Sequence, residues 1–309
     1  MSWPEIPYDG WRETCAALHL YSQVVGKYRL ARTPWQNHSW HATLYVTARG
    51  LNTSAIPDGP GAIDVELDLL DHAVVGRASD GRSGRFPLGP SSVAEFHARL
   101  LELVRSIGGT PQLDPHPNEI PGAIEFPQDR ASRPYDPAAV TRFFQALVQT
   151  RRVLQQFRTC FLGKVSPVHL FWGSFDLAVT RFSGRTAPRH PGGVPGLPDA
   201  VTREAYSHEV SSAGFWPGGA GVEAAAFYSY AYPSPAGFSG ARVRPAEASF
   251  DPKLGEFVLP YDAVRKARDP DEALLEFLHS TYDAAADLGR WDREALECPP
   301  GQLGHPRAV

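Results

Sequence analysis

Five of the eleven histidines lie in segments that also contain other polar or aromatic residues. His38 and His41 share the run NHSWH, His169 lies in PVHLFWG, His208 in YSHE and His19 in LHLYSQ. Imidazole is the commonest metal ligand and the usual acid–base group near neutral pH. A single histidine in an apolar run is more often a core residue hydrogen-bonded to the backbone, so spacing must separate the two cases.

Two polar pairs are four positions apart and therefore share a face in either a helix or a strand. They are His19 with Gln23, and Glu204 with His208. A carboxylate beside an imidazole raises its pKa and fixes its tautomer, which suits a general base or a metal ligand. The alternative for Glu204 and His208 is a solvent-facing pair on an edge strand.

Asp176 is a candidate for a different reason, because it interrupts the apolar run FDLAV. A carboxylate buried there is costly unless it is paired or bound to metal. The alternative is that Asp176 lies on the wet face of a half-exposed strand. We therefore predict a catalytic set made of His208, Glu204, His19, Gln23 and Asp176.

A metal site is the second prediction. His38 and His41 are three positions apart and converge only if NHSWH forms a turn. The alternative is a polar turn with Trp35 and Trp40 stacked on each other. If these segments meet in space, a divalent metal, zinc or iron, would be held by His38, His41 and His169 together with His208.

Arginines that follow the two Val-Thr runs indicate a substrate-binding set. Guanidinium groups suit carboxylate or phosphate, and aromatic walls suit a flat ligand. The predicted substrate-binding residues are Arg49, Arg181, Arg185, Trp172, Tyr206 and Trp216. The alternative is that the arginines only keep the strand ends soluble.

Composition and absent motifs narrow the function classes. A net charge of −4 gives no field that favours nucleic acid or an anionic membrane. The sequence holds no nucleotide-binding glycine motif, no H-E-x-x-H and no G-x-S-x-G. Three widely spaced cysteines, and a start without a signal-peptide pattern, predict a cytoplasmic protein.

The elements that must position these residues follow from periodicity. Helices are expected over 11–31 (where a strand is the alternative), 91–107, 137–161 and 270–291. Strands are expected over 40–48, 62–70, 72–79, 84–88, 166–182, 203–213, 225–232 and 255–260. In the strand expected over 203–213, Glu204, Tyr206 and His208 line one face.

This order, a helix, about four strands and a helix, occurs twice and predicts an internal duplication. The paired runs are GKYRL with GKVSP, LYVTARG with LAVTRFSG, and GRFPL with GEFVLP. We expect an α+β fold of two α-β-β-β-β-α units, with mostly antiparallel sheets, packed helices and a pocket at their junction. The expected segments are 1–107, a Pro-rich connector over 108–136, 137–297 with a Pro/Gly-rich loop at 186–200, and a tail over 298–309.

The runs LHLYSQVVGK, NHSWHATLYVTARGL, SPVHLFWGSFDLAVTRFSGR and EAYSHEVSSAGFWPG resemble an uncharacterised bacterial family whose function is unknown. The resemblance covers most of the chain and implies no activity, cofactor or catalytic residue.

From the residues alone we expect a small-molecule enzyme that acts on an anionic or polar aromatic substrate, with no nucleic-acid or membrane partner. One alternative is a non-catalytic sensor or carrier that uses the same pocket. Another is an interaction module that forms a homo-oligomer.

Overall fold

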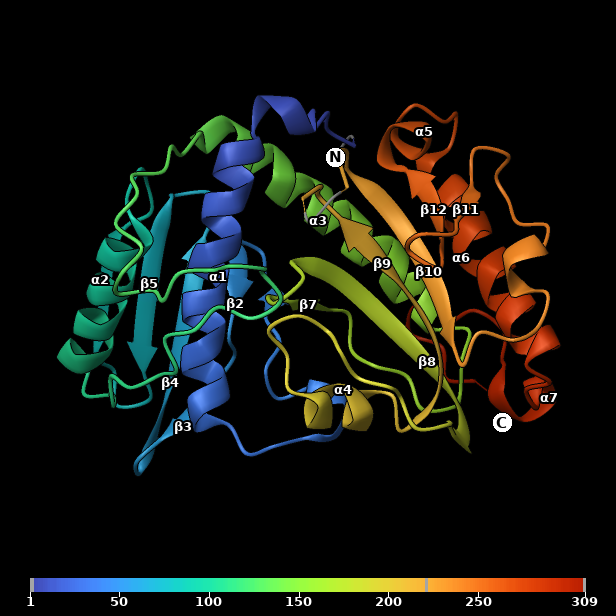
Figure 1. The fold of residues 1–309 in the computed structure, drawn as a ribbon, viewed down its shortest axis with the longest axis horizontal. Helices are drawn as coiled ribbons and strands as arrows, with labels where there is room; N and C mark the ends of the chain where they lie inside the picture. Colours follow the sequence, from blue (N-terminus) through green and yellow to red (C-terminus); the bar gives the residue numbers. More distant parts are fainter. Residues whose placement is uncertain (1–2, 220–221, 308–309) are drawn as a thin grey trace.

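The fold is α+β and contains two antiparallel sheets of six strands each (Figure 1). The computed structural model describes residues 3–219 and 222–307. The first sheet has the strand order β1-β2-β4-β5-β6, with β3 paired to β4. The second has the order β11-β12-β10-β9-β8-β7. Both sheets are therefore largely meanders, in which most chain neighbours are also sheet neighbours.

The first unit runs from α1 (Arg12–Arg32) through its sheet to α2 (Val93–Ser106). Its strands are β1 (Tyr45–Val46), β2 (Gly50–Asn52), β3 (Ile56–Asp58), β4 (Gly61–Asp68), β5 (Ala73–Ala78) and β6 (Ser83–Pro87). The short helix η2 (Asn37–Ser39) precedes β1. The expectation of helix over 11–31 is confirmed and its strand alternative is wrong.

The second unit runs from α3 (Pro137–Arg158) to α6 (Pro270–Leu288). Its strands are β7 (His169–Phe171), β8 (Asp176–Thr186), β9 (His208–Trp216), β10 (Ala226–Tyr232), β11 (Ser249–Asp251) and β12 (Glu256–Pro260). The shorter helices are α4 (Asp199–Ala205), α5 (Tyr261–Arg265) and α7 (Arg293–Leu296).

Helix starts follow the residues expected at helix caps. Ser92 accepts a hydrogen bond from the Glu95 amide at the start of α2. Asp136 and Asp269 cap α3 and α6, and each is followed by a proline at the first helical position. A side-chain acceptor satisfies an amide that the helix leaves free, and proline has no amide to leave unpaired. The sequence predictions for these helices are therefore confirmed.

The expected strand over 203–213 is wrong at its start. Residues 203–205 end α4, and β9 begins only at His208. The expected strand over 166–182 is two strands, because a turn separates β7 from β8. These local differences change which side chains can share a face.

In two places, equivalent positions of the two units are the same number of residues apart, and this number differs from the offsets of the paired runs found in the sequence. Arg32 and Arg158 end α1 and α3 and are 126 positions apart (158 minus 32). Leu44 and Leu170 are also 126 apart (170 minus 44), and they pair with each other in an antiparallel bridge between the units. Equivalent edge residues that pair antiparallel are the arrangement expected of two copies related by a two-fold axis. This arrangement is consistent with duplication.

The paired runs found in the sequence do not mark equivalent positions. Gly26 lies inside α1, whereas Gly163 follows the end of α3. Val46 ends β1, whereas Val179 lies inside the long β8. The match between GRFPL and GEFVLP does fall on strands, β6 and β12, that precede helices.

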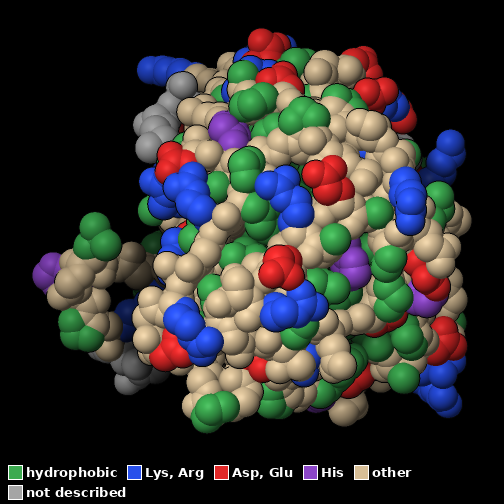
Figure 2. All heavy atoms as spheres, turned by 90° about the vertical axis from the view of Figure 1, so that its left-hand side faces the viewer, with side chains coloured by type: hydrophobic (Ala, Val, Ile, Leu, Met, Phe, Trp, Pro, Cys, Tyr) green, Lys and Arg blue, Asp and Glu red, His purple; other side chains and the backbone are tan. Residues whose placement is uncertain are grey.

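On the end of the molecule where α2 lies, positive and negative side chains are intermixed (Figure 2). Ion pairs on α2 include Arg105 with Glu102 at 2.5 Å. None of the described helices is long and apolar enough to cross a membrane.

Candidate functional site

A pocket of about 470 Å³ lies where the two units meet. Its floor is one face of the second sheet. Because side chains alternate along a strand, the even-numbered residues of β8, β9 and β10 face the pocket while their odd-numbered neighbours face the helices. The floor residues are Asp176, Ala178, Thr180, Phe182, Val210, Ser212, Tyr228 and Tyr230.

The pocket is closed by three other segments. The end of α1 and the turn around η2 contribute Lys27, His38 and His41. The Pro-rich connector contributes Asp114, Asn118 and Glu119. The Pro/Gly-rich loop and α4 cover it with Val194, Leu197, Pro198, Val201, Thr202 and Ala205. A cavity therefore lies at the junction of the two units, and part of the loop at 186–200 lies over it.

Asp176 lies at the centre of a hydrogen-bond network on the floor. It is 5% exposed, so the alternative of a wet strand face is wrong. Ser174 Oγ donates to one carboxyl oxygen and Tyr228 Oη donates to the other. Burial raises the pKa of Asp176, because two neutral donors only partly replace water.

A second polar group lies beside this network. The hydroxyls of Tyr206 and Tyr230 are 2.9 Å apart, and those of Thr180 and Ser212 are also 2.9 Å apart. Burial raises the pKa of Tyr206 to about 12, so it remains a neutral phenol. The floor thus presents several hydroxyl groups and a carboxyl group inside an otherwise apolar pocket.

Glu119 is a pocket residue that was not predicted from the sequence. Burial and the nearby carboxyl of Asp176 raise its pKa to about 7. Within the described chain its carboxyl group has no hydrogen-bond or ion-pair partner. It packs against Gly173, where any side chain would overlap it. The only signal in the sequence was its place in a Pro-rich connector, which suggested a spacer and not a site.

His19 and Gln23 hold this region together. The Gln23 side chain exchanges two hydrogen bonds with the backbone of Asn118, each 2.8 Å long. His19 Nε2 lies 3.0 Å and 2.9 Å from the carbonyl oxygens of Trp172 and Gly173. Burial lowers the pKa of His19 to about 4, so a neutral imidazole donates to these carbonyls. Both residues, predicted as catalytic, lie outside the pocket lining and position Glu119.

Glu204 and His208 do not form the expected pair. Glu204 lies on α4, and both of its carboxylate oxygens accept from the backbone amide of His38, at 3.1 and 2.9 Å. His208 is half-buried outside the pocket lining, with Nδ1 3.0 Å from Ser207 Oγ. The two side chains are separated because Glu204 belongs to α4 while the strand β9 begins only at His208, so they do not share the face of one strand.

His38 completes a clasp between the two units, which we call the latch and define as Glu204, Ala205, His38 and Lys164. His38 Nδ1 donates to the Ala205 carbonyl at 2.8 Å, and Lys164 Nζ donates to Nε2. His38 has a φ of +59°, in the left-handed region that non-glycine residues rarely adopt. Burial lowers the pKa of His38, which keeps this tautomer neutral.

The histidines expected to hold metal do not converge. His38 and His41 line the pocket, but His169 and His208 do not. In the described part of the chain, no group of three or more His, Cys, Asp or Glu side chains is arranged to hold a metal ion. The described residues thus show no preformed group of metal ligands, and the expected zinc or iron stays a prediction.

His41 is unusual in another way. It is 1% exposed, and its Nδ1 accepts from the Gln36 amide at 3.2 Å, which places the proton on Nε2. That Nε2 has no partner among the described residues. A buried donor without a partner is costly, and here it belongs to a residue of the pocket wall.

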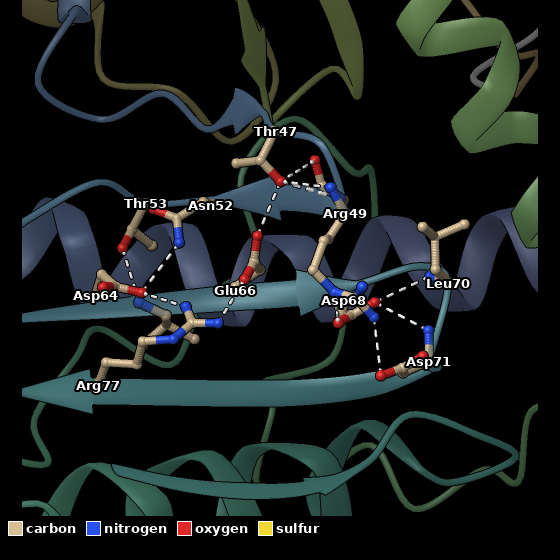
Figure 3. A network of polar contacts seen from close by, with 12 residues as sticks. Thr47, Arg49, Asn52, Thr53, Asp64, Glu66, Asp68, Leu70, Asp71 and Arg77 are labelled. Atoms are coloured by element: carbon tan, nitrogen blue, oxygen red, sulfur yellow. Dashed lines mark hydrogen bonds and ion pairs between the residues drawn. The ribbon is translucent and has the colours of Figure 1, made fainter. Parts of the chain in front are cut away.

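None of the three arginines lines the pocket. Arg49 bonds Asp68 at 2.6 Å and Asp71 at 2.8 Å on the first sheet (Figure 3). Arg185 pairs with Glu209 at 2.7 Å and donates to the Gly289 carbonyl at the end of α6. Arg181 is an odd-numbered residue of β8 and is buried on the helix side. The expected anion anchor is therefore not formed by these residues.

Among the expected aromatic residues, Trp172 and Tyr206 line the pocket. Trp216 does not line it but stacks on Tyr228, with ring centroids 4.3 Å apart. Trp35 and Trp40 also line the pocket, so the turn that contains NHSWH supplies part of an aromatic wall.

The fold and the site define an α+β protein of two joined sheets with a ligand-sized pocket between its units. The chain belongs to a family of unknown function, DUF5996, which matches residues 3–298. No curated protein and no solved structure matches the chain.

Proposed function

We propose that this protein is an enzyme that acts on a small molecule in the junction pocket, with Glu119 as the general acid–base group. The observation that carries the proposal is that Glu119 and Asp176 line the same pocket. A volume of about 470 Å³ falls within the usual range of small-molecule sites. Apolar walls with a few converging polar groups are typical of such sites.

The role of Glu119 follows from its surroundings. A carboxyl group whose pKa is about 7 is partly protonated at neutral pH, so it can accept a proton and return one. Burial raises the pKa of Glu119, and the carboxyl group of Asp176, held by Ser174 and Tyr228, raises it further. Gln23 fixes the backbone next to Glu119, which limits how far this carboxyl group can move.

Aromatic walls support a substrate with a flat or apolar part. Trp35, Trp40 and Trp172 line the pocket together with Phe171 and Phe182. Aromatic faces contribute both apolar contact and preferred stacking geometry. The polar part of the substrate would then meet the hydroxyl and carboxyl groups of the floor.

The alternative is a carrier or sensor that binds the same molecule without changing it. A test incubates wild-type protein, and separately Glu119→Gln, with an extract of small metabolites and follows both extracts by mass spectrometry. We expect wild type to consume a compound and form a product, and Glu119→Gln to do neither. A compound that is retained by wild type but chemically unchanged would instead identify a carrier.

The acid–base role has a test that needs no substrate. We expect ¹³C NMR of the Glu119 carboxyl to show titration near neutral pH, and Asp176→Asn to lower that pKa. A Glu119 that titrates like a solvent-exposed glutamate would contradict the catalytic proposal. Glu119→Gln keeps the volume of the side chain but cannot ionise, so it is the matched variant in which this titration should be absent.

We also propose a cytoplasmic location, supported by the three free cysteines Cys15, Cys160 and Cys298. The other alternative, a homo-oligomeric module, is tested by measuring mass in solution at increasing protein concentration.

A further inference from the structure

We infer that the ligand of the junction pocket is an organic cation, with an amine bound between Glu119 and Asp176. The inference rests on the proposed small-molecule pocket and specifies the chemistry of its ligand. It replaces the expectation of an anionic substrate, which depended on arginines that lie elsewhere.

Charge in the pocket wall is the first observation. The lining carboxylates are Asp114, Glu119 and Asp176, and the lining cation is Lys27. Lys27 Nζ lies 2.6 Å from Asp114, so these two charges offset each other. Glu119 and Asp176 then remain without a cationic partner in the part of the chain that the structure describes.

Burial in low-dielectric surroundings makes ionisation of Glu119 and Asp176 unfavourable without a nearby positive charge. A bound ammonium group would supply that charge and would favour the ionised form of each carboxyl group. An anion would instead be repelled by whichever of the two groups is ionised. The site therefore favours a cation over an anion of the same shape.

The aromatic walls are the second observation. Lys164 Nζ lies 5.3 Å from the ring centroid of Trp40 and 4.7 Å from that of Phe182. Lys27 Nζ lies 6.0 Å from the centroid of Trp172. Cations are attracted to aromatic faces at such distances, so rings of this wall can bind positive charge, although the protein's own lysines already contact these three.

His41 adds no further requirement on the ligand. Its Nε2–H has no partner among the described residues, but this atom is buried and does not open into the pocket, although other parts of His41 line it. The inferred ligand is thus an amine with an apolar or aromatic body.

Binding of an amine should depend on pH through Glu119. The groups that face Glu119 are Asp176 of β8, Tyr206 after α4, and the Lys27–Asp114 pair. A cation stabilises the ionised carboxylate, so binding lowers the pKa of Glu119 and releases a proton. Affinity should therefore rise as pH increases through about 7, where free Glu119 ionises.

The experiment compares benzylamine, benzyl alcohol and benzoate, three probes of similar shape and different charge. Calorimetry is done below and above the pKa of Glu119, in buffers of different ionisation enthalpy to count released protons. We expect benzylamine to bind more tightly than either other probe, and more tightly at the higher pH. Glu119→Gln and Asp176→Asn should each weaken benzylamine by about tenfold or more, with Glu209→Gln, outside the pocket, unchanged.

The outcomes separate this inference from the proposed function. Equal binding of benzylamine and benzyl alcohol, weakened alike by the pocket variants, would overturn the cation and leave the small-molecule pocket. Tighter binding of benzoate would also overturn the cation. Failure of all three probes to bind at millimolar concentration would count against the cation inference. The metabolite experiment above would then decide the proposed function independently.

Discussion

Arg181 was predicted to bind substrate because of its residue type, but its surroundings give it a role in packing. The side chain is 1% exposed, and its guanidinium lies 3.5 Å from the ring centroid of Phe157 and 4.3 Å from that of Tyr282. It also donates to the Phe157 carbonyl near the end of α3, where helix carbonyls are left unpaired. Its pKa is lowered to about 10 by burial, yet it remains charged at neutral pH.

We therefore predict that Arg181→Ala lowers the free energy of unfolding by about 2–4 kcal/mol, because it removes buried packing and cation–π contacts. Ligand affinity of the folded protein should not change, since Arg181 faces away from the pocket. Denaturant unfolding and calorimetry with benzylamine measure the two effects. Arg181→Met is the matched variant, and its smaller loss of packing should cost less. A loss of affinity without a loss of stability would return Arg181 to the binding site.

At the scale of elements, the loop that covers the pocket is organised by its own side chains. Asp199 Oδ1 accepts from the Gly193 amide at 2.9 Å, and Arg203 bonds Asp199 at 2.9 Å. The latch then fastens α4 to the turn at His38. Because α4 is short and held mainly at one end, we expect its local opening to need less free energy than opening of the sheets.

We predict that Glu204→Ala releases this lid, because the His38 amide loses its acceptor. Hydrogen–deuterium exchange should become faster at His38 and throughout α4, while the sheets exchange as before. The global free energy of unfolding should fall by only about 1 kcal/mol. Glu209→Ala is the control, because it removes a carboxylate from the face of β9 that points away from the pocket. Unchanged exchange in α4 would show that the latch does not hold the lid.

At the scale of the whole molecule, the two units are joined by more than the bridge between Leu44 and Leu170. The Trp172 indole donates to the Ala42 carbonyl and packs directly against Gly26 of α1. A Cβ at Gly26 would overlap the indole ring, so only glycine allows this approach. Gly26 therefore has a packing role in the joint between the units.

The substitution Gly26→Ala should consequently destabilise the protein, although in an ordinary helix it would stabilise by about 1 kcal/mol. We expect a loss of about 2 kcal/mol or more, because the indole must move and its hydrogen bond to Ala42 is strained. Urea unfolding followed by tryptophan fluorescence measures the change. In a Trp172→Leu background the same substitution should cost much less. A gain in stability from Gly26→Ala alone would contradict the packing seen here.

Much of the fold could be predicted because it depends on local patterns. Periodicity located the helices observed as α1, α2, α3 and α6, and a proline marked where α6 begins. The prediction failed at Glu204, because α4 is short and is held by contacts from a distant turn. It also missed β2, β3 and β11, each of which is only three residues long.

The sequence by itself determined the α+β class and the alternation that turns Asp176 toward one face of β8, since both follow from local spacing. Only the tertiary structure decided which residues share the pocket. Glu119 lies in a connector without regular structure, and its place beside Asp176 depends on Gln23, 95 positions from Asn118. The arginines looked equivalent in sequence but differ because one is buried behind the sheet and two are paired on the surface. Burial and distant partners, which set charge and pKa, are properties of the folded chain and cannot be read from spacing.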